Sequence, residues 1–329
     1  MARSGKFKAV AVAALVALAS TGKAGAAQCG STAAGFEAWK SQFADEAKGK
    51  SVSAATVAAF MATTYSTATI AADRGQRSFQ LSLDQFLAKR GGSAIVARGR
   101  ALKQSDAAMF ASIEQRFGVP PGPLLAIWGM ETGFGRSRGN QNTLSAVATL
   151  AYDCRRSEYF TDQLYAALTL IDRGILSAGT RGSMHGEIGH TQFLPKSILN
   201  YGTGGSLDNA ATALASTANF LKGHGWRAGA GYQPGEANFA AIQAWNAAPV
   251  YQQAIAVIAR QIDGDEGSSA RLRVTARICF EAVQRRTPDP RNAPQRHPEA
   301  AARKRGPRRM AACAVTPRTA TCAERSPPD

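Results

Sequence analysis

Hydrophobic residues recur every three or four positions along most of the chain between Ala27 and Asp263. This spacing places them on one face of a helix, so it predicts one mainly α-helical domain of a size that can bury a single substantial core. Gly91-Gly92 is expected to end one helix of this domain. Amphipathic helices are expected to begin near Phe36, near Leu83, at Asp208 or Asn209, and at Pro249.

The segment from 124 to 135 places an acidic residue on an apolar helical face. Leu124, Ile127, Trp128 and Glu131 follow the i, i+3, i+4, i+7 spacing of one face. A carboxyl group on a buried face is costly unless it is paired or held neutral. The presence of Glu131 on this face therefore needs a reason.

The surroundings expected for Glu131 favour its protonated form. The glycines of residues 133–135 predict that the helix ends just after Glu131, where the negative end of the helix dipole disfavours an anion. Desolvation beside Trp128 raises the carboxyl pKa in the same direction. A carboxylic acid that is protonated near neutral pH can donate a proton to a glycosidic oxygen. The alternative is a structural ion pair with Arg136 or Arg138.

Residues 174–205 break the helical pattern. The stretch is rich in glycine and turn-forming residues and has no sustained period. Irregular segments of this kind often carry function on a rigid scaffold, so we expect it to form a wall of a cleft.

Both ends of the chain differ from its middle. Residues 1–26 join basic residues, an apolar run and small residues, which is the pattern of a secretory signal peptide. We therefore expect an exported, periplasmic protein with no integral membrane segment after signal cleavage, and lipid anchoring is the alternative. Residues 268–329 are rich in Arg and Pro, with 8 of the 14 prolines after residue 269, which predicts a disordered tail. A shifted reading frame at the end of the gene is an alternative origin for this tail.

The formal charge of +16 is concentrated at the two ends. Residues 270–329 hold 14 Lys or Arg against 5 Asp or Glu, and four further basic residues precede Ala26. The remaining charge on residues 27–269 is only +3, which argues against a nucleic-acid partner. The basic tail could make weak electrostatic contact with anionic surfaces, although a solvated tail without such a role is the simpler interpretation.

The five cysteines form no CxxC pair, so no zinc knuckle or redox motif is indicated. Cys29 and Cys154 are the pair within the expected domain, and both a disulfide and two free buried thiols are compatible with export. His185, Glu187 and His190 are close in sequence, but they match no common zinc arrangement. We expect no metal and no cofactor.

Several motifs in order resemble one family. ETGFG at 131–135, GSMHGEIGHTQFLP at 182–195, FLKGHGW at 220–226 and AWNAAPVY at 244–251 together resemble the lytic murein transglycosylases of the membrane-bound type B family. The resemblance covers roughly residues 36–264. It implies a lysozyme-like, mainly α-helical fold with a small antiparallel β element near the cleft, and a catalytic domain spanning 27–267.

The resemblance also implies an activity and a set of site residues. Glycan strands of peptidoglycan would be cleaved at the MurNAc-β-1,4-GlcNAc bond without water, leaving 1,6-anhydromuramoyl ends. Glu131 matches the catalytic acid of the family, which then serves as the base. The matched substrate-binding residues are Ser183, Gln192 and Asn246, and the flanking aromatic residues Phe134 and Trp245 are expected at the cleft.

The chain departs from the family pattern at Glu187, where small or apolar residues are usual. Glu187 is a candidate second carboxylate, and such a group would make hydrolysis possible at a suitable separation from the reacting carbon. The simpler interpretation is a solvated or hydrogen-bonded wall residue. A hydrolytic muramidase on the same fold and a catalytically silent peptidoglycan-binding module therefore stay open as alternative functions.

Overall fold

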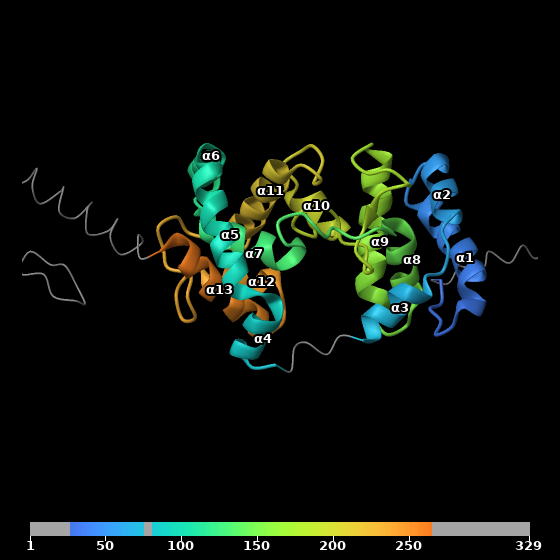
Figure 1. Cartoon of the computed structure of the whole chain (residues 1–329). Coiled ribbons are helices and arrows are strands. Elements are labelled where there is room, and N and C mark those ends of the chain that lie inside the picture. Colours follow the sequence, from blue (N-terminus) through green and yellow to red (C-terminus); the bar gives the residue numbers. More distant parts are fainter. Residues whose placement is uncertain (1–26, 76–80, 265–329) are drawn as a thin grey trace, which may run out of the picture.

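The computed structural model describes residues 27–75 and 81–264. The predicted signal peptide and the predicted Arg/Pro-rich tail lie outside these residues. The described part is mainly helical, as predicted (Figure 1). Its first helices are α1 (Phe36–Gly49), α2 (Ala54–Met61), α3 (Thr67–Arg74), α4 (Leu83–Arg90), α5 (Gly92–Ser105), α6 (Ala107–Phe117) and α7 (Pro121–Thr132).

The remaining elements include one small sheet. Strand β1 (Gln141–Asn142) pairs antiparallel with β2 (Arg181–Gly182), which confirms the predicted antiparallel element. The other helices are α8 (Thr143–Tyr152), α9 (Ser157–Asp172), α10 (Pro195–Tyr201), α11 (Ala210–Gly223), α12 (Phe239–Trp245) and α13 (Pro249–Asp263), and a 3-10 turn precedes α1 at Ala33–Gly35.

The predicted helix boundaries follow local chemistry. Gly91 ends α4 in the left-handed conformation at φ 69°, and Pro249 opens α13 as its first residue. The side chain of Asn209 accepts a hydrogen bond from the backbone nitrogen of Thr212 at 3.1 Å and so caps α11. The stretch 174–205 is less irregular than predicted, because a proline at 195 starts the short helix α10 within it.

The prediction of a single core is wrong, because the described residues form two hydrophobic clusters. One cluster takes residues from 36–70 and 144–168 and joins α1, α2, α3, α8 and α9. The other takes residues from 86–130 and 170–262 and joins α4 to α7 with α10 to α13. These clusters define two lobes, and α10 packs against both α9 and α11 between them (Figure 1).

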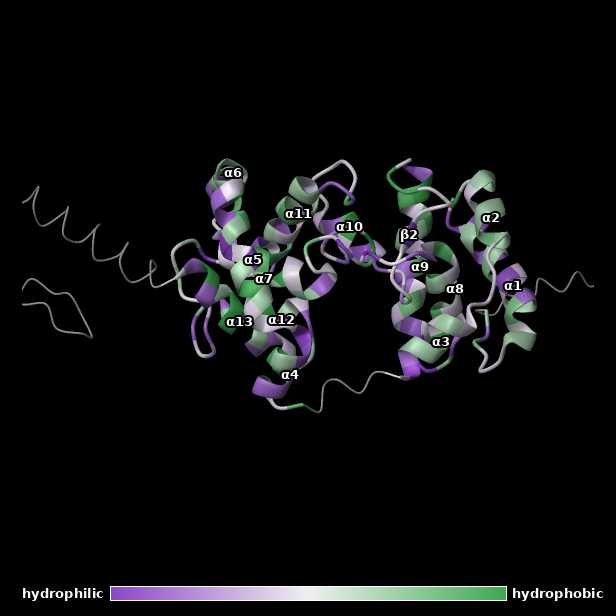
Figure 2. Cartoon of the chain, in the orientation of Figure 1, coloured by the Kyte–Doolittle hydropathy of each residue, from purple (hydrophilic) through white to green (hydrophobic). Residues whose placement is uncertain are grey.

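The second lobe is built around α7. Ten of its twelve residues are buried, and its ribbon is hydrophobic along most of its length (Figure 2). Helix α13 packs along α7 and buries Ile255, Ile258 and Ile262 on the predicted face. The end of α7 is therefore held rigidly, and this is where Glu131 stands.

The structure joins Cys29 to Cys154 in a disulfide, with the two Cα atoms 4.9 Å apart. The backbone supports this link, since Gly30 donates to the carbonyl of Tyr152 at 2.9 Å and Cys154 donates to Gly30 at 3.1 Å. Of the two open alternatives, the disulfide is thus the one adopted. In the described part of the chain, no helix is long and apolar enough to cross a membrane.

Candidate active site

Helix α7 places Glu131 at the edge of the second, hydrophobic lobe. Leu124 and Ile127 are fully buried on the same helical face, while Glu131 is only partly buried. The helix ends at Thr132, and Gly133 caps it in the left-handed region at φ 57°. The predicted end of the helix just after Glu131 is confirmed.

Two side chains from neighbouring helices hold one oxygen of the Glu131 carboxyl group. The hydroxyl of Tyr251 donates to Oε1 at 2.7 Å, and the indole nitrogen of Trp245 donates to the same oxygen at 3.1 Å. Trp245 ends α12, and Tyr251 lies in the first turn of α13. The short AWNAAPVY motif thus supplies both donors.

Tyr251 is a site residue that sequence reasoning missed. The helical period placed it among the core-facing isoleucines of α13, and its ring is indeed buried at 3% exposure. Its hydroxyl could have indicated the site, because a buried tyrosine oxygen requires a hydrogen-bond partner.

Burial raises the pKa of Glu131 from its ordinary 4.5 to about 7. The hydrogen bonds from Tyr251 and Trp245 and the charge of Arg90 act in the opposite direction, whereas the negative charge of Glu187 raises the pKa further. The carboxyl group can therefore be protonated in the resting protein near neutral pH and still be stable as an anion after giving up its proton. Burial and the nearby Glu131 also raise the pKa of Tyr251, which stays a donor.

The arginines considered as partners of Glu131 bind elsewhere. Arg136 donates from Nε to the carbonyl of Gly133 at 3.0 Å. Arg138 pairs with Asp208 at 3.5 Å. Within residues 27–75 and 81–264, Glu131 has no basic side chain within 4.0 Å of its oxygens. The structural ion pair is thus not formed with either arginine.

Ser183 and Glu187 form a compact unit directly after β2. The hydroxyl of Ser183 donates to Oε2 of Glu187 at 2.6 Å, and its oxygen accepts from the backbone nitrogens of His185 at 3.1 Å and Glu187 at 3.2 Å. The backbone nitrogen of Ser183 also donates to the carbonyl of Glu187 at 2.8 Å. This unit fixes the carboxyl group of Glu187 within electrostatic reach of Glu131.

The side chains of Gln192 and Asn246 form hydrogen bonds with backbone groups. Gln192 has a positive φ of 56°, and its amide nitrogen donates to the carbonyls of Gly189 at 2.8 Å and Arg138 at 3.3 Å. Asn246 accepts from the backbone nitrogen of Ala248 at 2.9 Å through its side-chain oxygen. The hydrogen bonds of Gln192 and the Asx turn that Asn246 forms beside Trp245 thus hold the loops on which the site is built.

Phe134 also has a positive φ, of 64°, and its ring packs edge-on against Trp128 with centroids 5.5 Å apart. Trp128 is buried and donates from its indole nitrogen to Nδ1 of His190 at 2.9 Å. The structure thus brings Trp245 directly to Glu131. Phe134 lies instead in the packing that carries the end of α7.

His185, Glu187 and His190 have separate partners. Glu187 binds Ser183, His190 accepts from Trp128, and Nε2 of His185 lies 3.9 Å from Asp73. In the part of the chain that the structure describes, no group of three or more potential ligands is placed to hold a metal ion.

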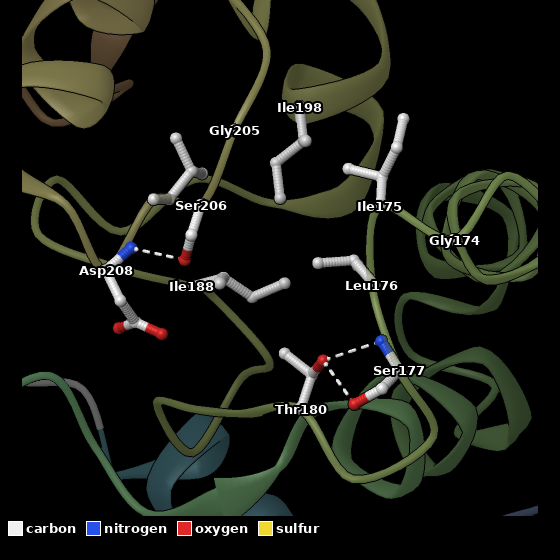
Figure 3. Close-up of a pocket in the computed structure, with 11 residues that line it drawn as sticks. Gly174, Ile175, Leu176, Ser177, Thr180, Ile188, Ile198, Gly205, Ser206 and Asp208 are labelled. Atoms are coloured by element: carbon white, nitrogen blue, oxygen red, sulfur yellow. Dashed lines mark hydrogen bonds between the residues drawn. The ribbon is translucent and has the colours of Figure 1, made fainter.

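A pocket of about 240 Å³ lies beside the glycine-rich stretch (Figure 3). Its apolar wall includes Leu176, Ile188 and Ile198, and its polar rim includes Ser177 and Asp208. Glu131 is not among the residues that line it. Ile188 forms part of this wall directly after Glu187 in the chain, so one short segment contributes to both the pocket and the Ser183–Glu187 unit.

Comparison with known proteins places this geometry in a family. The model of the Transglycosylase SLT domain matches residues 35–236. The membrane-bound lytic murein transglycosylase B of Escherichia coli (strain K12) is 37% identical over 120 residues, which make up 34% of this chain and 33% of that protein. The chain thus spans about a third of the length of this curated relative.

Solved structures share the fold. SltB3 from Pseudomonas aeruginosa, in complex with NAG-NAM-pentapeptide, matches with a TM-score of 0.64 and 26% identity over 70% of this chain and 80% of that one. The same protein with NAG-anhNAM-pentapeptide matches with a TM-score of 0.64 and 27% identity over the same shares. Slt35 from Escherichia coli, in complex with calcium, has a TM-score of 0.60 at 22% identity over 72% of this chain and 96% of that one.

The family model covers more than half of the chain, and the matched region contains Glu131 and the Ser183–Glu187 unit. The lysozyme-like transglycosylase fold is confirmed by the solved structures. The chain belongs to the Transglycosylase SLT domain family.

Proposed function

We propose that this protein is a lytic transglycosylase that cleaves the MurNAc-β-1,4-GlcNAc bond of peptidoglycan and leaves 1,6-anhydromuramoyl ends. The observation that carries the proposal is a single carboxyl group, that of Glu131, with a pKa of about 7 and two hydrogen-bond donors on one oxygen. The related murein transglycosylase and the SltB3 complexes with NAG-NAM and NAG-anhNAM peptides support the choice of substrate.

The reaction needs one residue in two roles. Protonated Glu131 gives its proton to the glycosidic oxygen as the bond from that oxygen to C1 breaks. Positive charge then develops at C1 and can be stabilised by the oxygen of the sugar's own acetamido group. The Glu131 carboxylate next takes the proton of the O6 hydroxyl as O6 bonds to C1, which closes the anhydro ring and restores the acid.

Tyr251 and Trp245 suit both halves of this cycle. Hydrogen bonds to a carboxylate are stronger than those to a neutral acid, so both donors stabilise Glu131 most after it has lost its proton. Burial opposes this effect and keeps the proton in the resting state. The balance gives a carboxyl group that can serve as acid and base near neutral pH.

The other matched residues have binding or supporting roles in this proposal. Ser183 and Trp245 contact the sugar near the acid, while Gln192, Asn246 and Phe134 shape the loops around it. The catalytic domain spans residues 27–267. The protein is exported to the periplasm through the signal of residues 1–26, and no cofactor takes part.

The test is mass spectrometry of the soluble muropeptides released from purified peptidoglycan by the wild-type protein and by Glu131→Gln. Anhydromuramoyl products from the wild type that vanish in the variant support the proposal. Reducing-end products would indicate a muramidase instead, and no release by either protein would indicate a binding module.

A further inference from the structure

We propose that Glu187 is a second catalytic carboxylate, which accepts a hydrogen bond from the acetamido N–H of the reacting sugar and stabilises the positive charge that forms there. The inference rests on the proposed function, because it concerns the same sugar and the same bond.

The position of Glu187 is fixed from both sides. Its Oε2 accepts the Ser183 hydroxyl at 2.6 Å, and its backbone nitrogen and carbonyl are both bound to Ser183. The next residue, Ile188, exchanges backbone hydrogen bonds with Phe193 at 2.9 and 3.0 Å. The Phe193 ring packs edge-on against Trp245 with centroids 5.3 Å apart, and Trp245 donates to Glu131. A short series of direct contacts therefore links the two carboxyl groups.

The charges around Glu187 leave it without a bound cation. The imidazole of His185 is close enough to feel the charge of Glu187, but burial lowers the pKa of His185 and favours its neutral form. Arg156 pairs with Asp73 at 2.8 Å. Within the described ranges, Glu187 has no basic side chain inside 4.0 Å, and its Oε1 accepts no hydrogen bond from the protein. Carboxylates with a purely structural role usually receive such partners. Oε1 is therefore available to a donor on the substrate.

A carboxylate near a second carboxyl group disfavours the ionised form of that group. The groups that face Glu131 are Tyr251 from α13, Trp245 from α12, Arg90 from α4 and Glu187 from the loop after β2. Of these, only Glu187 adds negative charge. When Glu131 gives up its proton, Glu187 repels the new negative charge unless a positive charge forms nearby at the same time. Glu187 therefore favours a positively charged intermediate.

The step balances without any further reagent. The acetamido oxygen bonds to C1 while the C1–O4 bond breaks and the Glu131 proton moves to O4. The resulting cation keeps its N–H, which donates to Oε1 of Glu187. O6 then bonds to C1, the acetamido oxygen leaves C1, and the O6 proton moves to Glu131.

Glu187→Gln tests the charge, because glutamine keeps the shape and can still accept from Ser183. We expect kcat to fall about 100-fold with little change in KM, as when a preorganised electrostatic group is removed. The alkaline limb of the pH–rate profile should move to lower pH, because loss of the negative charge lowers the Glu131 pKa. Glu114→Gln, at an exposed position on α6, is the matched control and should behave as wild type.

The type of muropeptide product distinguishes a failure of the Glu187 inference from a failure of the proposed function. Anhydro products from the wild type, with unchanged kcat and pH limb in Glu187→Gln, would overturn the inference and leave the proposed function intact. Selective loss of reducing-end products in the variant would also overturn it, because Glu187 would then activate water.

If Glu187→Gln does not fold, Glu187→Asp carries the test. The charge remains in this variant, so the alkaline limb of the pH–rate profile should stay in place and kcat should stay within about tenfold of wild type. A larger loss or a shifted limb in Glu187→Asp would contradict the inference.

Discussion

The proton on Glu131 is controlled by a few opposed contacts. Burial holds the proton on, and two donors, Tyr251 and Trp245, favour its release. Both donors bind the same oxygen, and within residues 27–75 and 81–264 no hydrogen bond reaches the other oxygen, which is therefore available to a substrate. Small changes at these contacts should therefore change the pH dependence of the reaction before they change the fold.

Tyr251→Phe removes one donor and leaves the ring in the core. We expect the Glu131 pKa to rise, because the lost hydrogen bond lowers it, and the alkaline limb of kcat against pH should move to higher pH. The rate should fall about tenfold, since one hydrogen bond to the carboxylate is worth about 1.5 kcal/mol. Tyr165→Phe on α9 serves as control, and an unchanged limb in Tyr251→Phe would contradict the assignment.

Glu131→Gln should stabilise the protein at alkaline pH. The folded pKa of about 7 lies above the ordinary 4.5, so the proton contributes stability that is fully present below pH 4.5 and is lost as pH rises through 7. Glutamine carries no charge and avoids a loss of up to about 3 kcal/mol, at about 1.4 kcal/mol for each pKa unit. Urea unfolding at pH 5 and pH 8 measures the difference, and a variant less stable than wild type at pH 8 would refute this reasoning.

Part of this site could be predicted from the amino-acid sequence. Glu131 stood out because a carboxyl group interrupted an apolar face, and the structure places Trp245 beside it. Tyr251 was missed because the helical period accounts for its ring but says nothing of where its hydroxyl points. The Ser183–Glu187 hydrogen bond depends on a tight loop that no periodic pattern predicts.

At the scale of elements, the ends of helices and the turn after β2 decide where the side chains stand. Caps and prolines made α4, α11 and α13 predictable from local sequence. Helix α10 has only seven residues, too few for a period to be recognised, and it was not predicted. Local signals thus give boundaries more readily than they give short elements.

Gly182→Ala should disturb the turn that holds Glu187. A Cβ atom at this position would lie 2.0 Å from the Glu187 carbonyl oxygen, so the backbone must shift. We expect a loss of about 1–3 kcal/mol in stability and at least a tenfold fall in rate. Gly49→Ala, where nothing lies within 4 Å of the added atom, is the control and should change neither quantity appreciably. Full activity in Gly182→Ala would show that the turn can shift without consequence.

At the scale of the whole molecule, the disulfide ties the first described residues to the turn between α8 and α9. That turn also carries Arg155 and Arg156, both of which pair with Asp73 on α3. The link spans 125 residues of sequence and joins parts of the smaller lobe. Long closed loops restrict the unfolded chain most strongly.

The double variant Cys29→Ser/Cys154→Ser should lose about 2–4 kcal/mol of unfolding free energy. Urea unfolding of the variant, compared with wild type in the presence and absence of a reducing agent, measures the effect. Reduced wild type should match the variant. Equal stability of oxidised wild type and variant would show that the link contributes nothing to the fold.

The two cores themselves could not be predicted, because the period of a helix shows which face is buried but not against which partner. Residues 36–70 and 86–130 carry the same type of apolar pattern, yet they enter different clusters. Only contacts between segments about 100 residues apart distinguish them.

The alternation of segments between the two cores has a consequence for the newly made chain. The partners of α1 to α3 in their core are α8 and α9, which are synthesised only after α4 to α7. Until then, apolar residues such as Phe36, Trp39 and Phe43 have no complete core to enter. A nascent chain that has reached α7 is therefore a natural client for chaperones, and its first helices are the segments that they would bind.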